Sequence, residues 1–273
     1  MSVPTKIAEF ASHAPRAFSA RGIVPVLLLA LLMAGCGKGD RDARSGAEEL
    51  YERGTKAMNS GNFANAVGYY EGLEARYPFS NQAKQAQLNL IFSYYRNGDR
   101  ELAVDAATQF EREHPTHPRV DYALYMRGLA NFAPEHNWFH RVFSVELWKR
   151  PPVNARESFS AFSRLVQRYP QSRYAPDAHQ RMVFLRNRLA QHENYVAEYY
   201  FKRGAYAAAA NRGKYVLETY EGAPAVADSL FIIVSSYERL GMQDLASAAR
   251  QVLEENYPDA AQPKGTKKRF FFF

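Results

Sequence analysis

The sequence has very little cysteine, and it lacks any long apolar run. Cys36 is the one cysteine among 273 residues, so a disulfide bond within the chain is excluded. The most apolar stretch, Ile23 to Met33, is too short to cross a membrane as a helix. There is also no glycine-rich phosphate loop, no nucleophile elbow and no paired-carboxylate motif. These absences favour a binding protein over an enzyme.

The seven histidines give little support for a metal site. His136 and His140 have the four-residue spacing that binds zinc on a helix, but no third ligand is evident. A periplasmic enzyme that uses the histidines is therefore an alternative, and a tightly bound metal in the purified protein would favour it. The net charge of +7 is not gathered in one segment, so no nucleic-acid partner is expected.

The first 35 residues have the layout of an export signal. Lys6, Arg16 and Arg21 precede the apolar stretch, which ends in Leu32-Met33-Ala34-Gly35-Cys36. Small residues directly before a cysteine resemble the lipobox of bacterial lipoproteins. In those proteins the chain is cut before the cysteine, and the thiol becomes lipid-modified.

We therefore predict a signal peptide over residues 1–35 and a lipid on Cys36, with no other cofactor. The polar residues 36–46 form a flexible tether in this interpretation. Gly37, in the place where an aspartate would retain such lipoproteins, favours the outer membrane, with the domain facing the periplasm. The alternative is an ordinary signal peptide followed by a free cysteine.

A layout of glycine, helix and proline recurs at a fixed period in the remaining chain. Gly61 and Gly98 are 37 positions apart, and so are Gly204 and Gly241. Apolar residues at three- and four-residue steps follow each glycine, which is the pattern of an amphipathic helix. The terminal prolines of the layout are Pro78, Pro115, Pro170 and Pro258. A period of this size is typical of a solenoid of stacked repeats.

The repeats resemble tetratricopeptide repeats, which are helix–turn–helix units. The expected fold is all-α, a tetratricopeptide-repeat solenoid of five helix pairs that follows the lipoprotein signal peptide. Repeats one to three occupy residues 47–175 and contain an aromatic insertion over 132–153, and repeats four and five occupy 176–260. Residues 261–273 form a basic tail that ends in four phenylalanines, for which no role is predicted. The insertion, with Trp138 and Trp148, is either a binding loop or a local hydrophobic plug.

One run from Pro176 to Lys202 is longer than a repeat helix needs, and we expect it to join the two sets of repeats. Its basic residues Arg181, Arg186 and Arg188 are expected to face solvent or a partner.

Resemblance to tetratricopeptide proteins implies a peptide-binding groove lined by the first helix of each repeat. An aromatic groove edged by arginine suits an extended peptide that has aromatic side chains and a terminal carboxylate. The alternative is that half of these aromatic side chains only pack between repeats. The predicted groove residues are Tyr51, Leu88, Phe92, Tyr95, Arg96, Tyr122, Tyr125 and Phe132.

The chain as a whole resembles the BamD family, lipoproteins of the outer-membrane β-barrel assembly machinery. The closest stretch, residues 155–212, includes Arg168-Tyr169-Pro170-Gln171-Ser172, Tyr174, Asp177-Ala178, Arg181-Met182, Val196-Ala197-Glu198-Tyr199-Tyr200 and Asn211-Arg212. The insertion departs from the family, because Arg150-Pro151-Pro152 stands in place of its usual Arg-Asp-Pro.

This resemblance implies binding without a covalent step. The N-terminal repeats would receive the C-terminal signals of unfolded outer-membrane proteins, and the C-terminal repeats would dock the periplasmic domains of BamA. Asn211 and Arg212 are the expected docking residues. Other lipoproteins of the machinery are further expected partners. A pilotin, a tetratricopeptide lipoprotein that guides secretin assembly, is the alternative, and it would lack the match over 155–212.

Overall fold

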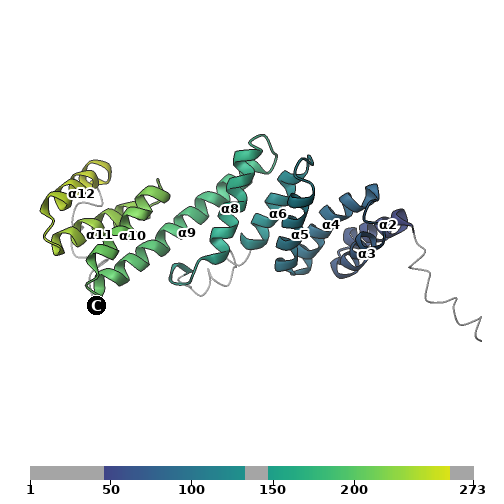
Figure 1. Ribbon diagram of the computed structural model, residues 1–273, viewed down its shortest axis with the longest axis horizontal. Helices are drawn as coiled ribbons and strands as arrows, with labels where there is room; N and C mark the ends of the chain where they lie inside the picture. The colour runs from purple at the N-terminus through teal and green to yellow at the C-terminus, as the bar shows by residue number, and fades with distance from the viewer. Residues whose placement is uncertain (1–45, 133–146, 259–273) are drawn as a thin grey trace, which may run out of the picture. The chain divides into compact units, whose positions relative to one another are not determined.

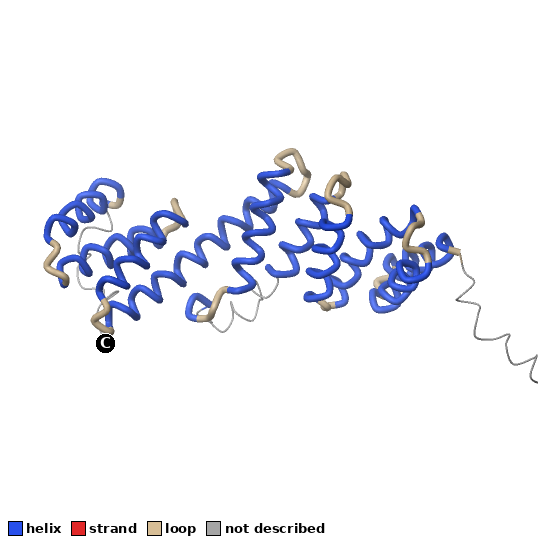
Figure 2. The backbone as a smooth tube through the Cα atoms, viewed as in Figure 1, coloured by secondary structure: helices blue, strands red, loops and turns tan. Residues whose placement is uncertain are grey.

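The structure is a computed structural model that describes residues 46–132 and 147–258. Within these two ranges, all regular secondary structure is helical (Figures 1 and 2). The helices form five consecutive pairs along the chain, as the repeat pattern predicts. The signal peptide, Cys36, Trp138, both histidines of the insertion pair and the phenylalanine tail lie outside the described residues.

Each repeat supplies two helices, and the second helix of one repeat packs on the first helix of the next. The third pair is separated by the insertion, whose described end is the short helix η1 (Leu147–Lys149). The pairs are α2 (Ala47–Asn59) with α3 (Phe63–Arg76), α4 (Asn81–Asn97) with α5 (Arg100–Glu113), α6 (Val120–Phe132) with α8 (Val153–Arg168), α9 (Ala175–Lys202) with α10 (Tyr206–Thr219), and α11 (Ala225–Arg239) with α12 (Gln243–Asn256).

Local sequence sets the ends of these helices. Ser80 caps the start of α4, where its side chain accepts a hydrogen bond from the backbone N–H of Ala83 at 3.1 Å. Gly98 ends α4 in the left-handed conformation, with φ of 96°, which glycine adopts without steric cost. The other three glycines of the 37-residue layout also have positive φ, so the predicted turns between paired helices are confirmed.

Small residues in the first helix of a pair let the second helix approach closely. A Cβ atom added to Gly54 would lie 2.6 Å from the ring of Tyr70 on α3. One added to Gly128 would lie 2.3 Å from the ring of Phe162 on α8. Tyr70 and Phe162 are both fully buried, so each glycine–aromatic contact forms the centre of its repeat.

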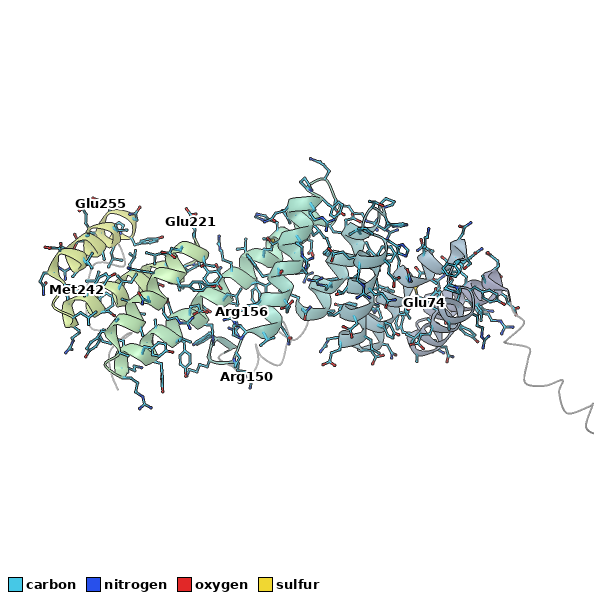
Figure 3. All side chains as sticks on the ribbon, in the orientation of Figure 1. Glu74, Arg150, Arg156, Glu221, Met242 and Glu255 are labelled. Carbon is cyan, nitrogen blue, oxygen red and sulfur yellow. The ribbon has the colours of Figure 1, made fainter. Side chains whose placement is uncertain are left out.

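Helix α9 has 28 residues and contacts α8, α10, α11 and η1. The predicted long run is confirmed, but the prediction that its basic residues face solvent or a partner is wrong for Arg188. Arg188 is buried and donates to the backbone oxygen of Arg150 at 3.3 Å. Arg186 donates to the backbone oxygens of Glu221 and Gly222 at 2.9 and 3.1 Å, in the turn that Figure 3 marks at Glu221. The long arginine side chains extend along α9, and their charged ends donate hydrogen bonds to backbone oxygens of neighbouring segments.

Candidate functional site

An arginine lies on an aromatic platform at the C-terminal end of α4. The Arg96 guanidinium is 4.8 Å from the ring centre of Phe63 and 5.6 Å from that of Phe92. The two rings contact edge to face, with centres 6.0 Å apart. Arg96 is exposed, and no carboxylate in the described part of the chain pairs with it. We call Phe63, Phe92 and Arg96 the Arg96 cluster.

A second group of aromatic side chains joins α6 to the start of α9. The Tyr125 ring stacks on that of Tyr174 at 4.7 Å, and Tyr122 lies 5.7 Å from Tyr174. The Tyr125 hydroxyl donates to Asp177 Oδ2 at 2.8 Å. Arg181 donates to the same carboxylate at 2.6 Å. These five residues form the Tyr125 cluster, which is held together by stacking and by one shared carboxylate.

The hydrogen bonds of the Tyr125 cluster change the acidity of its members. Burial, and the bond to the Asp177 carboxylate, raise the pKa of Tyr125 to about 12. Burial opposes ionisation of Asp177, but the hydrogen bonds from Arg181 and Tyr125 outweigh it and lower the pKa of that carboxyl. The cluster therefore holds a neutral tyrosine against an ionised aspartate at neutral pH.

Two of the predicted groove residues are buried, and a third is half-buried. Leu88 is 1% exposed and packs in the main core, so its assignment to a groove is wrong. Phe132 is also buried, with its ring 6.4 Å from that of Phe162 and beneath the guanidinium of Arg181. Tyr95 is half-buried and packs against two core clusters. Helix α4 contacts α6 as well as its neighbours in the chain, and Leu88 belongs to the same buried cluster as Val120 and Leu124 of α6.

The remaining groove residues take part in three groups of ring contacts. Tyr51 on α2 contacts Tyr70, with ring centres 6.1 Å apart, and its hydroxyl lies 3.4 Å from Asn89 Nδ2. Sequence reasoning did not include Phe63, Tyr174 or Asp177 in the predicted groove. The four-residue spacing of Asp177 and Arg181 was the available signal, because opposite charges at that spacing pair on a helix.

Arg212, one of the two predicted docking residues, belongs to an ion-pair network. Its Nη1 atom donates to Glu193 Oε2 at 2.9 Å, and Arg156 Nη2 donates to Glu193 Oε1 at 3.2 Å. Glu193 is 3% exposed, whereas both arginine side chains are about half exposed. Figure 3 marks Arg156 on α8, beside α9. We call these three residues the Glu193 network; it ties α8, α9 and α10 together, and Asn211 lies exposed next to it.

Neither a metal centre nor a membrane span is seen in the described ranges. No group of three or more histidine, cysteine, aspartate or glutamate side chains in residues 46–132 and 147–258 is placed to hold a metal ion. Over the same residues, none of the helices is both long and apolar enough to cross a bilayer.

The fold and these surfaces define a helical-repeat scaffold of the tetratricopeptide type, with an aromatic and arginine surface on its N-terminal half. A solved tetratricopeptide repeat protein from Thermus thermophilus is similar, with 17% identity and a TM-score of 0.38, and the match covers 78% of this chain and 92% of that one. The repeat architecture itself follows from the packing of the helices described above.

Sequence comparison then gives the family. The profile of the YfiO family, described as an outer membrane lipoprotein, matches residues 44–253. Outer membrane protein assembly factor BamD of Neisseria meningitidis is 41% identical over 243 residues, which are 86% of this chain and 91% of that protein. The protein of the same name from Vibrio cholerae is 38% identical over 208 residues, or 76% and 86% of the two chains. The chain belongs to the YfiO/BamD family.

Proposed function

We propose that this chain is an outer membrane protein assembly factor, a scaffold that binds unfolded outer-membrane proteins and presents them to the subunit that inserts them. The names of its relatives support this assignment, and so does the repeat fold. The work is binding, and no covalent step is required of any side chain described above.

The observation that carries the proposal is the Arg96 cluster. Its guanidinium is exposed, has no carboxylate partner among the described residues, and lies over two aromatic rings. An incoming peptide that ends in an aromatic residue offers a ring for Phe63 and Phe92 and a carboxylate for Arg96. In this proposal the Tyr125 cluster continues the surface toward the preceding residues of the peptide.

Docking of the inserting subunit is assigned to the C-terminal repeats, at the exposed parts of Asn211 and Arg212. The half-exposed guanidinium of Arg212 retains donors beyond the one that Glu193 accepts. A carboxylate on the periplasmic domains of BamA would accept hydrogen bonds from these remaining donors of Arg212. Anchoring to the outer membrane is assigned to a lipid on Cys36, with the repeats in the periplasm.

The pilotin alternative is not supported, because the family match extends through the stretch that a pilotin would lack. Binding of client proteins and of partner subunits of the assembly machinery is therefore to be tested first.

Two variants and two peptides test the Arg96 cluster. We expect Arg96→Gln to weaken binding of a peptide that ends in phenylalanine by about 10- to 100-fold, as expected for loss of a charge-assisted hydrogen bond. The same peptide with an amidated C-terminus should bind wild type weakly and should not distinguish wild type from Arg96→Gln.

Arg112→Gln is the matched control, since Arg112 is an exposed arginine on the neighbouring helix α5. Affinity is measured by fluorescence anisotropy of the labelled peptide. Equal loss for the acid and the amide peptide would show that Arg96 does not bind the carboxylate, and the proposed site would then be wrong.

A further inference from the structure

The last helix, α12, has an apolar stripe that no other described element covers. Met242, Leu245, Ala248 and Val252 follow three- and four-residue steps and so share one face of the helix. Met242 is 48% exposed, Leu245 49% and Val252 44%, although all three have large apolar side chains. Figure 3 marks Met242 and Glu255 near the two ends of this helix. We call these four residues the α12 stripe.

The α12 stripe is not the face on which a sixth repeat would pack, because the repeat-facing positions of α12 lie on a different face of the helix. In α10, the residues that face the next repeat are Ala210, Gly213 and Leu217, which pack with Ile233 of α11 or lie against its cluster. The positions 37 residues later in α12 are exposed polar residues, namely Ser247, Arg250 and Glu254. A polar end face closes a repeat array. The apolar stripe therefore needs another occupant.

We propose that residues 259–273 of this chain fold back along α12 and cover the stripe with the phenylalanines at 270–273. The described chain ends at Pro258, directly after α12, so the segment starts beside the helix. Eleven residues lie between Pro258 and Phe270, and the twelve steps from one to the other reach about 40 Å when extended. The stripe is only about 15 Å long, at 1.5 Å per helical residue. The segment is thus long enough to turn and return.

Charge complementarity supports the same occupant. The segment carries Lys264, Lys267, Lys268 and Arg269 directly before the phenylalanines. Helix α12 exposes Asp244 near its start and Glu254 and Glu255 near its end, while Arg250 is paired with Glu238. Acidic side chains therefore flank the apolar stripe, and basic side chains flank the aromatic segment. The interaction covers aromatic surface that would otherwise be exposed to water.

Photo-crosslinking in the full chain, in its own membranes, tests this docking. A benzoylphenylalanine at position 271 should form a crosslink within the chain, at the mass of one copy, and mass spectrometry should map it to residues 240–256. Leu245→Asp with Val252→Asp should reduce this crosslink about tenfold or more, because charges replace the apolar contact. Crosslinks to lipid, to a second copy or to another protein, or no crosslink at all, would overturn the proposal.

Leu102→Asp is the matched control, since Leu102 is 48% exposed and holds on α5 the position that Leu245 holds on α12. It should leave the crosslink unchanged. Lys267→Glu with Lys268→Glu changes no residue of the repeats and should also reduce the crosslink severalfold. An unchanged crosslink in either pair of charge variants would contradict docking on the α12 stripe. These results do not depend on client binding at the Arg96 cluster, so the two proposals fail separately.

Discussion

Single residues decide how closely the helices of a pair approach. The ring of Phe162 occupies the space where a side chain at Gly128 would lie. We expect Gly128→Ala to destabilise the chain by about 1–3 kcal/mol, because the core must shift to admit one methyl group. Urea unfolding followed by circular dichroism measures this change.

Gly68→Ala is the matched control for that substitution. Gly68 lies within α3, and an added Cβ meets nothing within 4 Å. Its replacement should stabilise the chain by about 0.5–1 kcal/mol, since alanine loses less entropy in a helix. The same sign of change for both variants would argue against close glycine–aromatic packing as the basis of the fold.

A second residue-scale prediction concerns acid. The pKa of Asp177 is lowered in the folded chain from the ordinary aspartate value of 3.8, so the ionised carboxylate stabilises the fold at pH values above that ordinary pKa. This stabilisation is lost as pH falls through the lower folded value. Between about pH 6 and about pH 3, Asp177→Asn should therefore lose less stability than wild type. Asp244→Asn, at an exposed site on α12, should follow the wild type.

The residue scale also shows where sequence reasoning was accurate. Glycine spacing and the apolar steps predicted four of the five helix pairs, because both are local properties of the chain. Leu88 and Phe92 lie one helical turn apart and look alike in sequence. Only Leu88 is fully buried, in a cluster shared with α6, which belongs to the next repeat. Burial on α4 depends on that second neighbour, which periodicity does not report.

At the scale of elements, α9 is the helix that joins the two sets of repeats. Its length followed from the unbroken run of helix-forming residues, but the role of its charged side chains did not. Arg186, Arg188 and Glu193 all bond to other elements, so their charges serve contacts that are distant in sequence. A pattern of charges on one helix resembles a solvated face whether or not partners from other elements meet it.

The Glu193 network gives a prediction at this scale. Glu193→Gln would leave two arginines beside a neutral buried amide, and we expect a loss of about 1–3 kcal/mol in unfolding free energy. Amide hydrogen exchange should rise in α10, which Arg212 ties to α9. Glu221→Gln, an exposed glutamate after α10, should change neither measurement. Unaltered exchange in α10 of Glu193→Gln would mean that the network does not hold these helices.

The whole molecule is a repeat scaffold that we propose is tethered to the outer membrane. We expect Cys36→Ala to remove the chain from the outer-membrane fraction, because no lipid can be attached. Density-gradient fractionation with detection of the chain by antibody measures this. Ser45→Ala, in the same predicted tether, should leave the distribution unchanged. Full recovery of Cys36→Ala in the outer membrane would remove the lipid anchor from the proposal.

The family and the fold could be predicted from sequence at this scale, because a repeat period and a long matching stretch extend over most of the chain. The proposed binding surface was predicted only in outline. Arg96, Phe92 and Tyr125 lie at exposed or half-exposed positions, but Tyr174 and Asp177 enter from a different repeat. Stacking between repeats combines side chains that no single repeat contains.

Depletion of the chain from its host tests the assembly function most directly. Newly made outer-membrane β-barrel proteins are followed by the change in gel mobility that accompanies folding, with a soluble periplasmic protein as the control. The account predicts that unfolded barrels accumulate while the soluble protein folds normally, and that a wild-type copy restores assembly. Barrels that fold at the normal rate in depleted cells would contradict it.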